Sequence, residues 1–251
     1  MERVNDGEWR KTTATSLRIV DAIEELGGAT LSEIADHMGL SSSTLYTHLN
    51  TLEGFGYITK AGDEYHLGLK LFHLGEIARY RDERYRLAKE KAFELADVTN
   101  EEVNFAVEEN GRSIILFDET NNPASEGYQV GRYFYMHNSA SGKAMLAEFD
   151  EDRREAILDR WGLPQETENT IVDRDELRAE LARTRERGYA VNDQEALEGL
   201  RSVAVPVNDS DGRVFGSLDV SGPPYRLPPD EELADLLQNA VDELETSIAM
   251  K

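Results

Sequence analysis

A capping motif, an apolar stripe and a glycine turn within residues 30–39 leave this segment few ways to fold. The letters TLSE at residues 30–33 fit the S/T-x-x-E capping box that begins a helix. Apolar residues recur there at helical spacing, namely Leu31, Ile34, Ala35 and Met38. Gly39 comes next, and a glycine in the left-handed conformation commonly ends a helix. The pattern predicts a short helix that stops at a sharp turn.

A second helix is predicted directly after this turn, capped by Ser41 or Ser42 and reaching about Glu53. One side of it is apolar and carries Leu45, Leu49 and Leu52. The opposite side is polar and carries Ser43, Tyr46, Thr47 and Asn50. Two helices joined by a tight turn, with a polar outward face on the second, are typical of a helix-turn-helix that enters the major groove of DNA.

The flanking segments complete a winged helix-turn-helix over residues 1–68. An earlier helix is predicted at about residues 15–26, where apolar residues recur at helical spacing. After Gly56, the letters YITK and EYHL predict two short strands joined through residues 61–63, which would form the wing. A small helical bundle without a role in DNA binding is the alternative interpretation.

The charge of this segment argues against a strongly cationic contact with DNA. Residues 1–67 hold 5 basic and 11 acidic side chains, and the whole chain has a net charge of −23. The acidic excess is spread along the chain, and lysine is scarce, with 7 Lys against 20 Arg. Such a diffuse acidic surface is typical of halophiles, in which molar salt shortens the Debye length to about 3 Å. We therefore expect a halophilic protein, with an acidic protein from ordinary salt as the alternative.

Composition also bears on the cellular location of the protein and on the kinds of chemical site that it can contain. The first 30 residues contain no apolar signal segment, and no apolar run approaches the roughly 18 residues of a membrane span. The lack of cysteine excludes disulfides, Cys-ligated zinc, iron–sulfur clusters and thiol catalysis. We expect a cytoplasmic protein that does not bind membranes, and we predict neither a cofactor nor a metal site.

The rest of the chain predicts a linker helix and a second domain. Residues 69–80 read as a helix that is apolar around most of its circumference, so several of its sides must be covered. Packing against the chain's own second domain would supply such cover. Residues 81–251 alternate helices with strands, with hairpin turns at residues 110–111 and 211–212. Helices are predicted near residues 83–98, 140–148, 151–161, 173–187 and 229–249. The order predicts an α+β fold with an antiparallel sheet in the second domain.

The second hairpin can be resolved face by face, because side chains alternate along a strand. One face is apolar and carries Val203, Val205, Val207, Val214, Leu218 and Val220. The opposite face then carries Ser202, Asp219 and Ser221. Alternation alone favours a polar side that faces solvent, and a buried polar pocket is the alternative.

An enzyme is the competing functional class, but the sequence contains few residues or motifs that could support catalysis. Only His137 of the five histidines lies in the second domain. No G-x-S-x-G nucleophile elbow and no H-E-x-x-H metal motif occurs. The segment SASGKA contains Ser and Lys without companion motifs, and we interpret it as the start of a helix. We predict that the chain is not an enzyme, and a ligand-converting or ligand-sensing protein that binds no DNA remains the alternative.

Several stretches together resemble the IclR family of transcriptional regulators. ATSLRIVDAI, LSEIADHMGLSSSTLYTHLNTLEGFGYI and HLGLKLFHLGEIAR resemble its N-terminal domain and linker. NSASGKAMLA and RGYAVNDQEALEGLRSVAVPVNDSDGRVFGSLDVSGP resemble its effector-binding domain. The resemblance covers almost the whole chain in order. It implies a winged helix-turn-helix at residues 1–68, a linker and dimerisation helix at 69–80, and a GAF-like effector-binding domain at 81–251.

In that family a small ligand, commonly an organic acid, occupies the C-terminal domain. Carried over by motif, the resemblance places effector contacts at Ala140, Ser141, Asn192, Ser202, Asp219 and Ser221. The chain departs from the family at three of them, since members often have Asp at Asn192, a small or thiol residue at Ser202 and Ser at Asp219. A buried carboxylate at Asp219 would repel an organic acid. We therefore expect a polyol, a sugar-derived ligand or an amine-bearing ligand.

The resemblance further implies a dimer, or a dimer of dimers, that binds near-palindromic operator DNA and controls a metabolic operon, commonly a catabolic one. We predict contacts with base edges or phosphates at Ser42, Ser43, Tyr46, Thr47, Asn50 and Lys60. Asn50 is the residue best suited to adenine. Arg10 and Lys11 would add phosphate contacts if the N-terminal arm lies along the duplex. Many family members carry Arg where this chain has Thr47.

Overall fold

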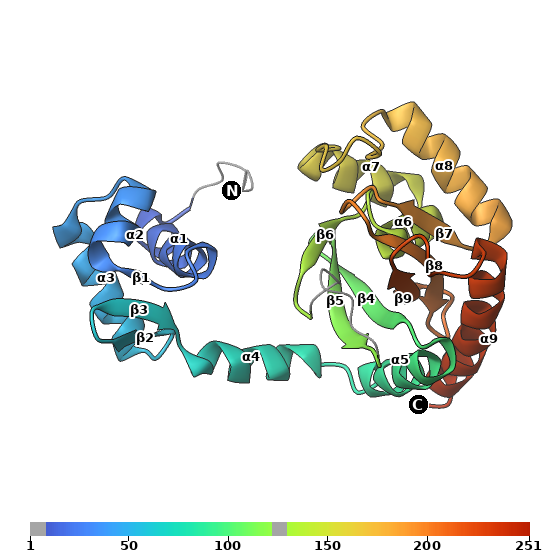
Figure 1. Ribbon diagram of the computed structural model, residues 1–251, viewed down its shortest axis with the longest axis horizontal. Helices are drawn as coiled ribbons and strands as arrows, with labels where there is room; N and C mark the ends of the chain where they lie inside the picture. The colour runs from blue at the N-terminus through green and yellow to red at the C-terminus, as the bar shows by residue number, and fades with distance from the viewer. Residues whose placement is uncertain (1–8, 122–129) are drawn as a thin grey trace. The chain divides into compact units, whose positions relative to one another are not determined.

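The computed structural model describes residues 9–121 and 130–251, and the chain divides into two compact units, residues 1–81 and 82–251. Figure 1 shows the elements of each unit. In the described part, the first unit comprises α1 (Lys11–Glu25), β1 (Ala29–Thr30), α2 (Leu31–Met38), α3 (Ser42–Gly54), β2 (Ile58–Ala61), β3 (Glu64–Leu67) and α4 (Leu69–Arg79). Three helices and an antiparallel hairpin confirm the predicted winged helix-turn-helix.

Local interactions fix the ends of α2. The Thr30 side chain accepts a hydrogen bond from the backbone of Glu33, and the Glu33 carboxylate accepts one from the Thr30 backbone at 2.8 Å. This reciprocal pair is the capping box that the sequence predicts. Gly39 ends the helix with φ at 63°, a conformation that costs a glycine little. The turn between α2 and α3 therefore follows from residues 30–39 themselves.

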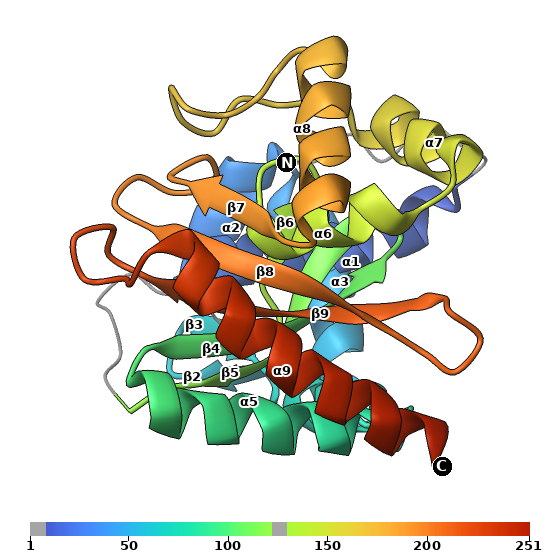
Figure 2. The ribbon, with the colours of Figure 1, turned by 90° about the vertical axis from the view of Figure 1, so that its right-hand side faces the viewer.

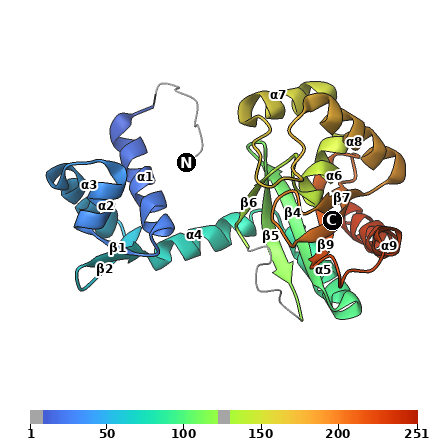
Figure 3. The same ribbon diagram turned by 45° about the horizontal axis from the view of Figure 1, so that its top comes forward.

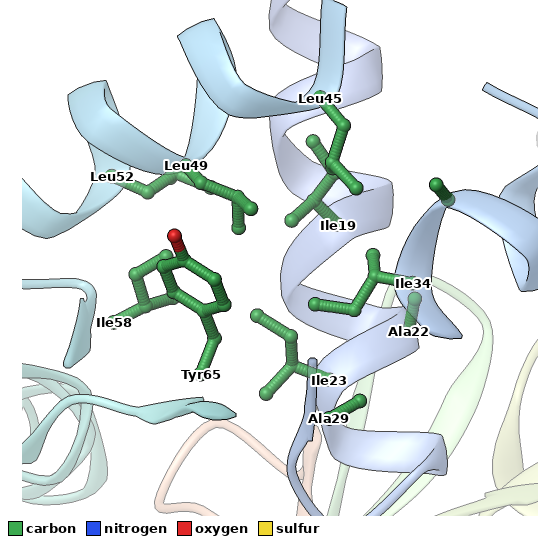
Figure 4. Packing of buried hydrophobic residues seen from close by; sticks show 11 residues of the cluster. Ile19, Ala22, Ile23, Ala29, Ile34, Leu45, Leu49, Leu52, Ile58 and Tyr65 are labelled. Atoms are coloured by element: carbon green, nitrogen blue, oxygen red, sulfur yellow. The ribbon is translucent and has the colours of Figure 1, made fainter. Parts of the chain in front are cut away.

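A single apolar core holds the three helices and the wing together. Figure 4 shows side chains from every element of this unit except α4 converging on one centre. The main members are Ile19, Ile23, Ile34, Leu45, Leu49, Ile58 and Tyr65, each at most 2% exposed. Burying one such side chain contributes about 1.5–3 kcal/mol. The predicted apolar stripe of α3 lies in this core, so its polar side faces outward.

The structure corrects two details of this unit. Helix α1 begins at Lys11, four residues before the predicted start, because its first turn carries no apolar stripe that periodicity could detect. Arg10 is the N-cap, so Lys11 belongs to α1 itself and only Arg10 precedes the helix. The two-residue strand β1 was not predicted, since it exists only through its pairing with β3.

The second unit is built on one six-stranded antiparallel sheet, with strand order β6-β5-β4-β9-β8-β7. Its strands are β4 (Glu102–Glu109), β5 (Arg112–Glu119), β6 (Tyr133–Tyr135), β7 (Ala190–Asp193), β8 (Arg201–Asn208) and β9 (Val214–Gly222). Its helices in the described residues are α5 (Tyr85–Thr99), α6 (Ala140–Glu148), α7 (Glu151–Trp161), α8 (Arg174–Arg187) and α9 (Asp230–Ala249). The α+β fold with an antiparallel sheet is confirmed.

The helices cover the two faces of the sheet differently. Helices α5 and α9 lie side by side against one face (Figure 2), while α6 packs on the other face, against β7, β8 and β9. Helices α7 and α8 pack on α6 through the apolar cluster that includes Met145, Leu158 and Leu177 (Figure 3). The sheet is therefore enclosed between two layers of helix. No helix in the described residues is both long and apolar enough to cross a membrane.

The edge strands β6 and β7 were not predicted. Each has only three or four residues, and each pairs with one neighbour alone. Strands this short carry too few residues for alternation to stand out from a loop. The hairpin between β4 and β5 is as predicted, because Asn110 and Gly111 both have positive φ, at 56° and 82°. That pair of angles is what a two-residue type I′ turn requires.

Candidate DNA-binding face and effector site

The outward face of α3 presents polar side chains on a rigid helix. Ser41 caps the helix and accepts a hydrogen bond from the Thr44 backbone at 3.3 Å. The predicted contact residues of α3 are all exposed, namely Ser42, Ser43, Tyr46, Thr47 and Asn50. The Thr47 hydroxyl donates to the Ser43 carbonyl at 3.2 Å, so this side chain offers its methyl group and oxygen lone pairs outward. A threonine methyl suits contact with the methyl group of thymine.

Helix α3 is held to α1 as well as to the core. Ser16 of α1 and the Nδ1 atom of His48 on α3 are 2.8 Å apart and share a hydrogen bond. On the far side of α3, Asn50 is exposed and makes no side-chain hydrogen bond with any described residue. Its amide is therefore available to pair with a base edge, as bidentate recognition of adenine requires.

The wing contributes an exposed cation to this unit. Lys60 on β2 is exposed, and its Nζ atom lies 5.2 Å from the centre of the Tyr65 ring. Arg10 is also exposed, immediately before α1. The predicted contacts on α3, together with Lys60, thus occur on elements of one compact unit.

The polar side of the β8–β9 hairpin is buried. Ser202, Asp219 and Ser221 are 0%, 2% and 0% exposed. The solvent-facing arrangement that alternation alone favours is therefore wrong. The reason is tertiary, because α6 packs against this part of the sheet, and no alternation pattern within β8 and β9 can report that contact.

Strand pairing extends the buried polar face onto two more strands. Asn104 of β4 lies opposite Asp219 of β9 and, on its other side, opposite Asp118 of β5. Glu102 of β4 lies opposite Ser221. Residues directly opposite in an antiparallel sheet point to the same face. The second unit therefore contains a continuous polar surface in which three acidic residues stand close together.

These side chains are joined by hydrogen bonds. The Nδ2 atom of Asn104 donates to Asp219 Oδ2 and to Ser221 Oγ, both at 3.2 Å. Ser221 Oγ donates in turn to Glu102 Oε1 at 3.3 Å. From α6, Ser141 Oγ donates to Asp219 Oδ1 at 2.5 Å. Helix and sheet are thus connected through Asp219.

The first turn of α6 sits close to the sheet because small residues line the contact. Ala140 is 1% exposed and packs with Ala144, Ala190 and Ala204. A side chain at Gly142 would place its Cβ 2.5 Å from the Met136 carbonyl oxygen. Ala140 and Ser141 are the first two residues of α6, as the predicted range 140–148 implies. Ala140 supplies close packing, whereas Ser141 supplies a polar contact.

Asn192 lies at the other end of the polar surface, on edge strand β7 opposite Ser202. Its Nδ2 atom donates to Ser202 Oγ at 3.4 Å, and its Oδ1 atom accepts from the backbone of Glu195 at 2.8 Å. The Glu195 carboxylate pairs with the buried ammonium of Lys143 on α6. The segment that follows β7 is thus tied to α6 by a buried ion pair, which holds Asn192 in place.

Burial changes the acidity of this surface. It raises the pKa of Asp219 to about 7, against the opposing effect of the hydrogen bonds from Ser141 and Asn104. Burial likewise raises the pKa of Asp118 to about 7, and the nearby carboxylates of Glu102 and Asp219 raise it further. No lysine or arginine in residues 9–121 and 130–251 is hydrogen-bonded to either aspartate. Both carboxylates therefore take up protons far more readily than ordinary aspartates.

Five of the six predicted effector residues are brought together by this geometry. Ser141, Asn192, Ser202, Asp219 and Ser221 line the buried polar surface, and Ala140 lies directly beside it. Sequence reasoning missed Asn104, Glu102 and Asp118. Alternation does place Glu102 and Asn104 on one face of their strand. Their role could not be recognised, because the pairing of β4 with β9 joins segments more than 100 residues apart.

The groups that an enzyme would need are engaged elsewhere. His137 is buried, its Nε2 atom is 3.1 Å from the Pro164 carbonyl, and burial lowers its pKa to about 4. Ser139 caps α6, and Lys143 is paired with Glu195. In the described part of the chain, no cluster of three or more His, Asp or Glu residues is arranged to hold a metal ion.

Comparison with known proteins covers both units. The family model described as the IclR helix-turn-helix domain matches residues 14–62. The model described as the bacterial transcriptional regulator IclR C-terminal domain matches residues 85–246. These two matches account for most of the chain and lie on the two units that the structure separates.

Individual proteins show the same likeness. A probable HTH-type transcriptional regulator, ArcR of Halobacterium salinarum, is 33% identical over 236 residues, covering 90% of this chain and 89% of the relative. The HTH-type transcriptional regulator KdgR of Escherichia coli is 32% identical over 212 residues, covering 83% of this chain and 81% of that protein. The crystal structure of the Thermotoga maritima IclR superposes with a TM-score of 0.77 at 25% identity, covering 96% of this chain and 99% of the other. These relatives are regulators of transcription, so a ligand-converting or DNA-independent protein is not favoured.

Proposed function

The chain belongs to the IclR family of transcriptional regulators, and we propose that it binds near-palindromic operator DNA as a dimer or a dimer of dimers. As a member of this family it is a DNA-binding, ligand-responsive regulator. The observation that carries the proposed contact is the exposed polar face of α3, opposite a fully buried leucine stripe. In a symmetric dimer, two such helices enter major grooves about 34 Å apart, or a multiple of that distance.

The contacts we propose on DNA come from α3 and the wing. Asn50 would read adenine, and Tyr46 and Thr47 would contact base edges or the backbone. Ser42, Ser43 and Lys60 would contact phosphates or bases. Arg10 would add a phosphate contact just before α1. These assignments rest on exposure and on position within a helix-turn-helix, the fold in which this helix faces DNA.

The proposed dimer contact lies on α4. None of its residues is buried, and Leu69, Phe72 and Ile77 are 86%, 70% and 58% exposed. Apolar side chains exposed to this extent along one short helix indicate a surface that another chain covers. The proposed effector site is the buried polar surface of the second unit. We propose that the effector shifts the population of DNA-binding arrangements through α4.

The proposed setting is the cytoplasm, where a regulator meets the chromosome, and the proposed targets are genes of metabolism, commonly catabolic genes. We further propose that the protein does not convert its effector, since Ser139, Lys143 and His137 are committed to structural contacts.

Mapping the bound sites across the genome tests the proposal most directly. We expect a small set of near-palindromic sites upstream of metabolic genes. Deleting residues 1–68 serves as the matched control, because it removes the helix-turn-helix and leaves the second unit intact. Operator binding should be lost and effector binding kept. Specific DNA binding by the truncated chain, or turnover of the effector by the full chain, would contradict the proposal.

A further inference from the structure

The donors of the proposed effector site are already in use. The Ser141 hydroxyl donates a hydrogen bond to Asp219, and the amide of Asn104 donates to both Asp219 and Ser221. The Ser221 hydroxyl donates a hydrogen bond to Glu102. A serine hydroxyl has one proton to donate and an asparagine amide has two. The side chains of Ser141, Asn104 and Ser221 therefore have no further hydrogen-bond donor for a ligand.

Acceptors, in contrast, are left over. The Oδ1 atom of Asn104 is completely buried and has no hydrogen-bond partner among the described residues. The Oδ1 atom of Asp118, directly opposite Asn104 on β5, is also buried without a partner in that part of the chain. Leaving a buried acceptor unpaired costs about 1–3 kcal/mol. Both atoms belong to the polar surface, so a ligand that donates hydrogen bonds there would remove the cost.

Charge decides which kind of donor fits. Glu102, Asp118 and Asp219 gather on one face of the sheet, where Glu102 raises the pKa of both aspartates and Asp219 raises that of Asp118. An organic acid would add a further negative charge to this group. The first turn of α6 would ordinarily favour an anion. Here a carboxylate is already bonded to that turn, because the Ser141 hydroxyl donates to Asp219.

A neutral polyol and a cationic ligand differ in what they offer this surface. Hydroxyl groups would satisfy Asn104 and Asp118, but would leave the repulsion among the carboxylates unchanged. An ammonium, amidinium or guanidinium group supplies two or more donors together with the compensating charge. Hydrogen bonds to charged groups are about twice as strong as neutral ones. The surface is therefore complementary to a cation.

We infer that the effector carries a positively charged amino, amidino or guanidino group, which binds against Asn104, Asp118 and Asp219. This inference rests on the proposed function, in which the same surface is the effector site. It narrows the ligand from any donor-rich metabolite to a small organic cation.

A matched series of four-carbon probes tests the inference with the full-length protein. The probes are 1,4-diaminobutane, 4-amino-1-butanol, 1,4-butanediol and succinate, which keep the four-carbon chain and change the charge and hydrogen-bonding groups at its ends. Binding is measured by calorimetry and by the shift in melting temperature, in one buffer of constant salt. We expect both amines to bind at least about tenfold more tightly than the diol, and succinate to bind most weakly.

Three variants locate the effect. Asp118→Asn and Asp219→Asn remove a charge from the surface while keeping the shape of the side chain, and each should reduce the preference for amines about tenfold. Glu186→Gln is the control, because it removes the same charge from an exposed position on α8, outside the polar surface. It should leave the preference unchanged.

Several results would overturn the inference. They are tighter binding of succinate, equal binding of diol and amines, binding of none of the four probes, and a preference for amines that survives in both Asp variants. Operator binding is measured in parallel on the same proteins. If the protein binds its operators but shows no preference for amines, the inference about the effector fails and the proposed regulator stands. If the unaltered protein does not bind operator DNA, the proposed function as a DNA-binding regulator fails.

Discussion

The second unit contains buried polar side chains whose environment costs the folded protein stability. Asp118 and Asp219 are carboxylates whose pKa values are raised to about 7 by burial, and Asn104 holds an unpaired acceptor between them. Perturbed groups of this kind cluster at binding sites, where a ligand completes them. These positions therefore lower the free energy of unfolding.

The first prediction concerns pH. Between about pH 4 and pH 7 the unfolded chain releases the proton of Asp219 while the folded chain retains it, so the free energy of unfolding falls as pH rises through that window. Asp219→Asn cannot ionise and should be more stable than the unaltered protein near pH 8, with little difference near pH 4. Urea unfolding of both proteins across this range measures the difference. A constant difference at all pH values would show that the pKa of Asp219 is not raised.

The second prediction concerns the buried ion pair between α6 and the segment after β7. Lys143→Met should lower the free energy of unfolding by about 3–5 kcal/mol, because it leaves the carboxylate of Glu195 buried without its cation. Burial already raises the pKa of Glu195, so the loss should grow with rising pH. Replacing both partners, with Lys143→Met and Glu195→Leu, should restore most of the stability. An equal loss in the double variant would mean that packing, and not charge, is responsible.

The third prediction concerns the recognition face. Asn50→Ala should weaken operator binding by about 1–3 kcal/mol, the usual contribution of a good base contact, and leave binding to random DNA nearly unchanged. Thr51→Ala is the matched control on the next residue, since the Thr51 hydroxyl donates to the Thr47 carbonyl of its own helix. Fluorescence anisotropy on both DNAs separates the outcomes. Equal losses on operator and random DNA would show that Asn50 contacts only the backbone.

Among the elements, helices were more predictable than short strands. The expected ranges 140–148 and 151–161 coincide with α6 and α7, because a capping side chain, Ser139 or Asp150, precedes each helix. The strands β1, β6 and β7 were missed, since pairing with a neighbour is what makes them strands. Hydrophobic periodicity shows which side chains of a segment are buried. A segment of two to four residues is too short for such a period to be recognised.

The element with the clearest testable role is α4. Phe72→Glu should weaken self-association, because it places a charge in the exposed apolar surface that we propose a second copy covers. His73→Glu adds the same charge about 100° around the helix, at another exposed position, and should weaken association less. Analytical ultracentrifugation over a range of concentrations measures the change. Unaltered association in Phe72→Glu would place the dimer contact on another element.

For the molecule as a whole, the net charge of −23 bears on how DNA is bound. A face with few cations releases few counterions, so its affinity depends little on counterion release and more on hydrogen bonds and shape. We predict that specific operator binding persists in about 2 M potassium chloride, with a shallow dependence of affinity on salt. Titrations of one operator at several salt concentrations measure the slope. Binding confined to low salt would contradict the expectation of a halophilic protein.

Local patterns in the sequence predict the helix-turn-helix, the wing and the α+β class, through interactions within a few residues such as the Thr30 capping box and the Gly39 turn. Alternation puts Asp219 and Ser221 on one face, and resemblance to the IclR family supplied Ala140, Ser141 and Asn192. The burial of this face, and its completion by Asn104 and Asp118, depend on contacts between segments far apart along the chain. The contacts of β4 with β9 and of α6 with the sheet join segments that no local pattern relates.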